Sequence, residues 1–324
     1  MFKILYKTLK RFLSPDKRKQ LEIISLLGYG YRCKTEEVKP LIIYSLDGKL
    51  FTNGLVDRLR GVVNSYAYAK ANNLEFRIEH KSPFPLEEFL TPNTCDWILQ
   101  PFEKSYNLRY ASPVCMLDNP NETGESLLKL SKERQYHFYT NSGNLISFIN
   151  KTKGTSYTIA SLYNELFTPS QKLKDEIDKQ KKILGDNYIS ISFRFMQLMG
   201  DLVDIHGETL SDAEQKKLTE ACITQIERVK EQHPSVDKIL VTSDSQKFID
   251  SVSNIPYVYV IPGEIGHIGH MGGDIFMKTF LDFYMIAGAK KVYLGVGNKM
   301  YRSNFSHFAA QIQGKPFELI EFKL

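Results

Sequence analysis

The chain has 324 residues, of which 42% are apolar and 12% aromatic, enough to bury the cores of two domains of ordinary size. The formal net charge of +5 suits a protein that handles a phosphate-bearing ligand, but it falls short of a nucleic-acid-binding signature, so we expect no nucleic-acid partner. The cysteines Cys33, Cys95, Cys115 and Cys222 show no CxxC spacing. A disulfide framework or a structural zinc site is therefore not expected, and the pattern fits a reducing cytoplasm.

Residues 1–38 are predicted to be a basic, amphipathic N-terminal segment. No run of 18 or more apolar residues occurs in the chain, so no membrane-spanning helix is expected. Within residues 1–19, apolar and basic side chains would occupy different faces of a helix, namely Phe2, Leu5, Leu9, Phe12 and Leu13 against Lys3, Lys7, Lys10 and Arg11. Such a helix either lies on an anionic membrane surface or packs on the protein. We expect a cytoplasmic protein, with peripheral contact to the inner face of the membrane as an open alternative.

Residues 39–160 are predicted to form a Rossmann-like domain. The apolar run at 41–44 predicts a buried strand, 57–71 a helix and 74–78 the next strand, which together make one βαβ unit. Residues 83–155 mix short apolar runs with prolines, and loops and short elements are predicted there. A helical stretch at 157–184, interrupted by Pro169, is the expected connection between domains.

Residues 161–324 are predicted to form a second Rossmann-like domain, because strands and helices alternate regularly. The predicted strands are 188–195, 237–243, 256–261, 291–295 and 317–322, and the helices between them are 211–232, 245–254, 273–287 and 303–313. This alternation implies a parallel sheet covered on both faces. The fold class is α/β, with two such domains and a cleft between them, although one large doubly wound domain would show the same periodicity.

Ligands of doubly wound folds bind at the carboxyl ends of the parallel strands, so the residues that follow each strand are the candidates for a site. Residues 54–61 run from a glycine loop into a helix that carries Arg58 and Arg60. Helix N-terminal amides and guanidinium groups both favour anions. A solvated helix start has the same appearance, so the stretch by itself leaves both interpretations open.

Two later strands end in polar residues. Arg194 follows an otherwise apolar strand, where it would hold a diphosphate or form a structural salt bridge. Asp244 and Ser245 follow the next strand, just before a helix, and either bind a ligand or cap that helix.

The last candidate stretch lies between His267 and Ala310. It contains a glycine-rich loop and a helix start at Ser303, which would bind phosphate through its amides or be simply capped. His267 and His270 have no evident third ligand, and no metal site is predicted.

Together and in this order, these stretches resemble the fucosyltransferase superfamily of GT-B enzymes, which includes α1,2-, α1,6- and protein O-fucosyltransferases. The resemblance is carried by Gly54–Gly61, Leu166–Ser170, Ser192-Phe193-Arg194, Asp282–Ala289 and Ser303–Ala310. It covers about two thirds of the chain and is strongest after residue 160. The chain departs from the family at two positions, because Ser192 replaces the usual histidine and Phe195 replaces the second arginine found in several branches.

The resemblance implies an inverting, metal-independent glycosyltransferase that transfers fucose from GDP-fucose to a hydroxyl of a glycan or lipid-linked glycan in surface polysaccharide synthesis, with no cofactor. Arg194 would stabilise the departing diphosphate. The catalytic set is Arg194, Arg58 and Asp57, and the donor-binding set is Arg60, Ser192, Asp244, Ser245, Asp282, Ser303, Asn304 and Ser306. Asp282 would contact the guanine or the ribose. The catalytic base, which would deprotonate the acceptor hydroxyl, is left open among Asp57, Asp201 and Asp274.

Three alternatives remain at this stage. The same fold would serve another GDP- or UDP-linked hexose, or a noncatalytic nucleotide- or glycan-binding protein that has lost the His and Arg of positions 192 and 195. A Rossmann oxidoreductase is disfavoured, because no Gly-x-Gly-x-x-Gly follows the first strand of either half.

Overall fold

The computed structural model describes residues 21–22, 24–34, 38–46, 48, 54–116, 125–141, 145–202, 208–266 and 273–323. The predicted amphipathic stretch at residues 1–19 lies outside this part of the chain. The chain divides into two compact units, Met1–Thr168 (unit 1) and Pro169–Leu324 (unit 2). The division predicted at residue 160 falls inside helix α5 (Ile159–Leu166) of unit 1.

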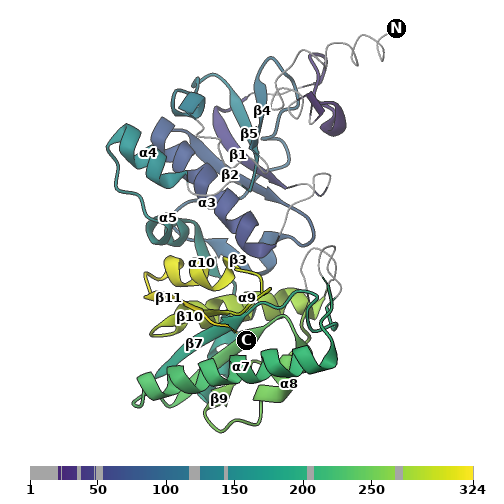
Figure 1. The fold of residues 1–324 in the computed structure, drawn as a ribbon. Helices are drawn as coiled ribbons and strands as arrows, with labels where there is room; N and C mark the ends of the chain where they lie inside the picture. The colour runs from purple at the N-terminus through teal and green to yellow at the C-terminus, as the bar shows by residue number, and fades with distance from the viewer. Residues whose placement is uncertain are drawn as a thin grey trace. The chain divides into compact units, whose positions relative to one another are not determined.

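Unit 1 contains a four-stranded parallel sheet with the order β2-β1-β5-β4 (Figure 1). Its strands are β1 (Leu41–Leu46), β2 (Glu75–His80), β4 (Ala111–Met116) and β5 (Gln135–Thr140). Helix α3 (Leu55–Asn72) packs on β1, β2 and β5, and α4 (Ile146–Lys153) and α5 pack on α3. The short elements are the 3-10 turns η1 (Leu86–Glu88) and η2 (Glu125–Leu128) and the strand pair β3 (Leu90–Pro92) and β6 (Phe167–Pro169).

The prediction of loops and short elements over residues 83–155 missed two of the four sheet strands, β4 and β5, which lie there. β4 contains Pro113, which lacks the backbone N–H that a central strand needs; β4 tolerates it as the edge strand of the sheet. β5 carries Gln135 and His137, which are fully buried because a polar network satisfies them. Gln135 accepts from the Ser105 amide (2.9 Å), and His137 contacts Tyr29 and Gln135.

Unit 2 contains a five-stranded parallel sheet with the order β11-β10-β7-β8-β9. The strands are β7 (Tyr188–Phe193), β8 (Lys238–Ser243), β9 (Val258–Tyr259), β10 (Val292–Val296) and β11 (Phe317–Glu321), and the helices are α6 (Gln171–Leu184), α7 (Asp212–Gln232), α8 (Gln246–Val252), α9 (Asp274–Gly288) and α10 (Phe305–Ile312). The chain proceeds from β7 outward to β9, then returns to β10 on the other side of β7. The boundary between β7 and β10 is therefore the topological switch point, where open α/β sheets bind ligands.

Helices cover both faces of this sheet. Ile189, Ile191 and Phe193 of β7 share a core with apolar residues of α7 and α8. The opposite face meets α9, because the Tyr188 hydroxyl donates to the Met285 carbonyl over 2.6 Å. This is the arrangement that the alternating sequence pattern predicted.

No helix among the described residues is long and apolar enough to cross a membrane.

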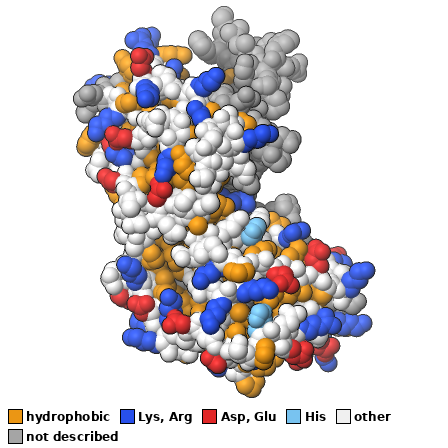
Figure 2. Space-filling view, turned by 90° about the vertical axis from the view of Figure 1, so that its left-hand side faces the viewer, with side chains coloured by type: hydrophobic (Ala, Val, Ile, Leu, Met, Phe, Trp, Pro, Cys, Tyr) orange, Lys and Arg blue, Asp and Glu red, His pale blue; other side chains and the backbone are white. Residues whose placement is uncertain are grey.

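On the face of unit 2 that Figure 2 shows, in the lower part of the view, Lys and Arg side chains are interspersed with Asp and Glu side chains.

The contact of α3 with its sheet depends on a glycine in the helix. A Cβ atom at Gly61 would lie 2.2 Å from the Thr140 carbonyl oxygen and 2.9 Å from the Tyr44 ring. We expect Gly61→Ala to lower the free energy of unfolding of unit 1 by about 1–3 kcal/mol, because the helix must shift to make room. Urea unfolding followed by fluorescence of Trp97, the one tryptophan of the chain and a fully buried residue of unit 1, measures this change.

Gly30→Ala in the same unit is the matched control. Its Cβ would meet only the Cys33 sulfur, at an ordinary 3.6 Å. Equal effects of the two substitutions would contradict the packing argument.

Candidate functional site

The carboxyl end of β7 carries Arg194, whose guanidinium lies 3.2 Å from a carboxylate oxygen of Asp244. Asp244 follows β8, the neighbouring strand, and also accepts hydrogen bonds from the backbone amides of Phe195 (2.8 Å) and Met196 (2.7 Å). The loop after β7 is thus held by the residue after β8. Arg194 keeps 23% of its side-chain surface exposed, against 6% for Asp244, so the arginine is the part of this pair that a ligand can reach.

Two opposing effects act on the Asp244 carboxyl group. Burial raises its pKa above the ordinary value, while the Arg194 charge and the two backbone amides lower it, and burial prevails. A buried carboxylate needs such partners, because leaving it without them is costly. Asp244 therefore orients Arg194 and the β7 loop. The prediction that Asp244 itself contacts the donor is untested, and its oxygens are already used within the protein.

The second part of the site is the start of α10, which follows β10 across the switch point. The Tyr301 amide donates to the Arg194 carbonyl over 3.2 Å, joining the loop after β10 to the end of β7. Asn304 is the N-cap residue and makes no side-chain cap, and the Ser303 hydroxyl accepts from the Phe305 amide. The first-turn amides of a helix have no intrahelical acceptors and favour an anion.

Ser306, in the first turn of α10, is a polar residue without a visible partner. It is fully buried, and its hydroxyl has no hydrogen-bond partner among the described residues. Buried hydroxyls are normally satisfied by protein, water or ligand. Arg194, at the end of β7, and Ser303, Asn304 and Ser306, at the start of α10, were predicted from sequence as separate contacts. They follow β7 and β10, the two strands that flank the switch point.

Ser192 and Ser245 have internal partners. The Ser192 hydroxyl lies 2.8 Å from the Thr242 hydroxyl on β8. Ser245 is fully buried, caps α8 through the Phe248 amide, and donates to Asp201 over 2.8 Å. Asp201 also accepts from the Lys247 amide. Ser245 is therefore a helix cap in this structure, and Asp201, considered above as a base, holds the start of the same helix.

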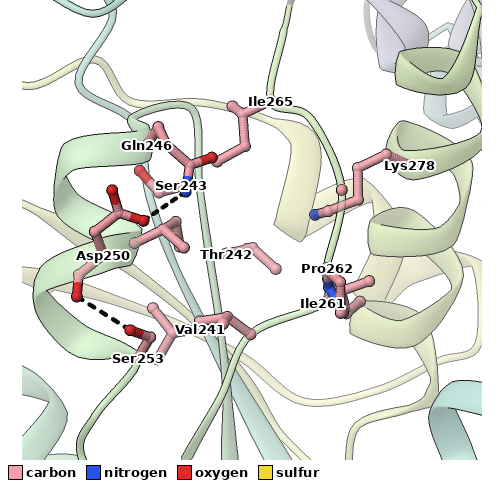
Figure 3. A pocket seen from close by; sticks show the side chains of 13 residues that line it. Val241, Thr242, Ser243, Gln246, Asp250, Ser253, Ile261, Pro262, Ile265 and Lys278 are labelled. Atoms are coloured by element: carbon pink, nitrogen blue, oxygen red, sulfur yellow. Dashed lines mark hydrogen bonds between the residues drawn. The ribbon is translucent and has the colours of Figure 1, made fainter.

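A pocket of about 210 Å³ opens beside β8, between α8 and α9 (Figure 3). Thr242 and Ser243 line its floor, Gln246 and Asp250 of α8 line one wall, and Lys278 of α9 reaches in from the opposite wall. Apolar side chains of the segment after β9, among them Ile261, Pro262 and Ile265, complete the lining. The pocket is partly polar and partly apolar, as small-molecule sites are.

Asp282, predicted to contact a guanine or ribose, is bound to Lys278. The lysine ammonium lies 2.6 Å from both carboxylate oxygens, one helical turn away on α9. The two side chains are 10% and 15% exposed. Burial raises the pKa of Asp282, and the Lys278 charge opposes that rise. No role was predicted for Lys278 from the sequence, although its i,i+4 spacing to Asp282 is the signal that marks such a pair.

The predicted residues of unit 1 lie in the first turns of α3. Asp57 and Arg60 form an ion pair of 3.0 Å, 28% and 24% exposed. Arg58 is 5% exposed, and its guanidinium donates to the Ser82 carbonyl over 2.8 Å. Burial lowers the pKa of Arg58. The structure thus gives Arg58 a structural contact, and its role at a phosphate stays a prediction.

His80, at the end of β2, shares the surroundings of Arg58. Its Nδ1 donates to the Phe84 carbonyl over 3.0 Å, and the residue is 3% exposed. Burial, together with the Arg58 charge, lowers the pKa of His80 to about 4. The imidazole is therefore neutral at physiological pH.

Metal ligation finds no support in the described part of the chain, where no cluster of three or more His, Cys, Asp or Glu side chains could hold an ion. His267 and His270 lie outside the described residues.

Comparison with known proteins identifies the fold. No protein-family model and no curated protein sequence matches the chain. Solved structures do match. A mutant of Arabidopsis thaliana FUT1 in complex with GDP superposes with a TM-score of 0.55 at 12% identity, over 97% of this chain and 77% of that one. Fucosyltransferase NodZ from Bradyrhizobium gives a TM-score of 0.55 at 15% identity, over 89% of this chain and 96% of that one.

NodZ soaked with GDP-fucose, described as an α-1,6-fucosyltransferase, gives a TM-score of 0.52 at 14% identity, over 85% of this chain and 93% of that one. The fold is that of the GT-B fucosyltransferases, as the resemblance implied. Identities this low establish the fold, whereas the activity must be argued from the site.

The contact between Asp244 and the β7 loop generates a prediction about stability. We expect Asp244→Asn to destabilise unit 2 by about 2–4 kcal/mol, because an amide cannot accept two backbone hydrogen bonds and neutralise Arg194 as well. Urea unfolding followed by circular dichroism measures the loss, while Trp97 fluorescence reports unit 1 separately. Asp178→Asn, at an exposed position of α6, is the control. An unchanged unit 2 would contradict the account of Asp244.

His80 generates a prediction about pH. Because the folded-state pKa lies below the unfolded value of about 6.5, the contribution of His80 to stability is present above pH 6.5 and is lost as pH falls towards 4. Between pH 7 and pH 4.5 we expect the wild type to lose about 2–3 kcal/mol more unfolding free energy than His80→Asn, which keeps a donor near Phe84. Urea titrations read by Trp97 at both pH values decide this, and equal losses would refute it.

Proposed function

We propose that the protein is a glycosyltransferase that binds a nucleoside diphosphate sugar in unit 2. Arg194 and the start of α10 would contact the diphosphate. The observation that carries this proposal is the hydrogen bond from the Tyr301 amide to the Arg194 carbonyl, which joins the loop leading into α10 to the end of β7 at the switch point. Arg194 is a cation that a buried carboxylate orients. The start of α10 adds helix N-terminal amides and the buried Ser306 hydroxyl, and the two groups together would suit a dianion.

The chemistry that this site supports is departure of the diphosphate. As the bond from the sugar to the leaving phosphate breaks, negative charge develops on the phosphate oxygens, and fixed cationic and N–H donors stabilise it without a metal ion. Arg194 supplies the guanidinium donors. Ser303, Asn304 and Ser306 supply hydroxyl, amide and backbone groups. An acceptor hydroxyl attacking the opposite face of the anomeric carbon would invert its configuration.

The sugar and the nucleobase of the donor are proposed from the solved structures of similar fold. FUT1 was crystallised with GDP and NodZ was soaked with GDP-fucose, so GDP-fucose is the donor we propose. The acceptor is a hydroxyl of a glycan or lipid-linked glycan in surface polysaccharide synthesis. Asp57, Arg58 and Arg60 of unit 1 are proposed to position the acceptor, with Asp57 as the candidate for the catalytic base that deprotonates its hydroxyl.

We further propose that the enzyme works in the cytoplasm, with residues 1–19 contacting the inner face of the membrane. The amphipathic pattern of those residues supports this proposal. A membrane contact would place the enzyme beside a lipid-linked acceptor.

One observation favours a second function, that of a noncatalytic nucleotide-binding protein. Phe195, at the position of the second arginine in the resemblance, is fully buried and packs 4.9 Å from the Phe248 ring. That position belongs to the core of unit 2 and supplies no charge to the site. Turnover of the donor distinguishes this function from the first.

Calorimetric titration with GDP, GDP-fucose, UDP and UDP-sugars in EDTA tests the proposal. We expect GDP to bind without metal and Arg194→Ala to weaken it about 10- to 100-fold, because a charge-assisted hydrogen bond to the diphosphate is lost. Arg228→Ala, on α7, is the matched control. Wild-type binding without turnover of GDP-fucose would favour the noncatalytic function, and an undiminished Arg194→Ala affinity would refute the assigned site.

A further inference from the structure

We propose that the ring of Tyr301 is the contact surface for the sugar of the donor, next to the groups that bind the diphosphate. This inference rests on the proposed function, because the diphosphate contacts at Arg194 and the start of α10 define where the sugar begins. It adds a residue that holds the transferred group. No role was predicted for Tyr301 from the sequence.

Tyr301 is the exposed aromatic side chain of unit 2 among the residues that the structure describes. Its exposed fraction is 54%, whereas the other phenylalanines and tyrosines described in this unit are buried or half-buried. The ring leaves apolar surface in water that a ligand can cover. Because single apolar side chains are common on protein surfaces, the meaning of this one depends on where it lies.

The backbone of Tyr301 is held between the two parts of the proposed diphosphate site. Its amide donates to the Arg194 carbonyl over 3.2 Å, and its carbonyl accepts from the Ser303 amide over 3.0 Å. Chain segments joined by a backbone hydrogen bond lie about 5 Å apart. The Tyr301 side chain therefore begins beside Arg194 and two residues before Ser303, at the edge of the groups proposed to bind the phosphates.

The residue before Tyr301, Met300, anchors this loop in the core of unit 2. Its side chain is 8% exposed and belongs to the apolar core around β7 and β8, and its amide closes a turn on the Gly297 carbonyl over 3.1 Å. A Cβ at Gly297 would lie 2.7 Å from the Phe322 ring, so the turn is closely packed. The Tyr301 ring is thus presented from a fixed backbone, and binding costs little ordering of the loop.

A sugar beside the diphosphate needs a contact that phosphate-binding groups do not supply. A hexose has a face of C–H groups, and fucose carries a methyl group in place of the usual hydroxymethyl. An aromatic ring packs against such a face and removes apolar surface from water, while the tyrosine hydroxyl remains in solvent. Arg194 and the helix start attract charge instead. Tyr301 therefore holds the transferred sugar rather than the nucleotide.

Calorimetry with GDP and GDP-fucose in EDTA tests this inference, because the ratio of the two dissociation constants measures what the sugar adds. We expect Tyr301→Ala to leave GDP affinity within about twofold of the wild type and to weaken GDP-fucose about five- to tenfold. Since the ring is exposed, folding tolerates its loss, and retained GDP affinity shows that the variant is folded. Tyr301→Phe keeps the ring and should bind both ligands as the wild type does.

Tyr31→Ala is the matched control, because it removes a tyrosine of unit 1 that is 65% exposed. It should change the affinity of neither ligand. Arg194→Ala separates this inference from the proposed function, since it should weaken GDP and GDP-fucose alike and leave their ratio unchanged.

A ratio that stays at the wild-type value in Tyr301→Ala overturns this inference. An equal loss for GDP and GDP-fucose overturns it too, because the residue would then support the diphosphate site or the loop. So does a Tyr301→Phe variant that behaves like Tyr301→Ala, which would assign the effect to the hydroxyl. If the wild type binds neither ligand, the proposed function fails as well; if GDP binds through Arg194 and the ratio ignores Tyr301, only this inference fails.

Discussion

The site of unit 2 depends on one interaction, the hold of Asp244 on the chain after β7. A single buried carboxylate accepts the amides of Phe195 and Met196 and pairs with Arg194. It therefore shapes the loop and aims the guanidinium at once. Because Arg194 and Asp244 directly follow two adjacent strands, the pairing of these strands fixes the distance between the two residues.

The other parts of the candidate site lie on the strands on either side of β7. β10 lies on the other side of β7, and the Tyr301 amide of the loop that leads into α10 donates to the Arg194 carbonyl, so the proposed phosphate contacts lie on the two chain segments that flank the switch point. On the β8 side the sheet edge ends early and leaves a pocket that Lys278 enters. The proposed anion contacts follow β7 and β10, and the pocket lies beside β8, the strand next to β7.

The sequence predicted the elements of unit 2 well, because alternating strands and helices with capped starts give a strong periodic signal. It did not predict strands β4 and β5, because Pro113 and buried polar residues such as His137 interrupt the apolar pattern by which strands are recognised. Arg194 and Ser306 were found as candidates, but the pairing of Arg194 with Asp244 spans 50 residues and depends on strand order. The Lys278 contact was missed because residue type alone does not show which side chain enters a pocket.

Backbone hydrogen exchange with and without GDP, in metal-free buffer, tests the central claim most directly. If the diphosphate binds at the switch point, GDP slows exchange of the amides of residues 195–197 after β7 and 303–307 at the start of α10, while the amides of unit 1 in α3 change less. Unchanged exchange in both segments at saturating GDP, or protection confined to unit 1, would contradict the account.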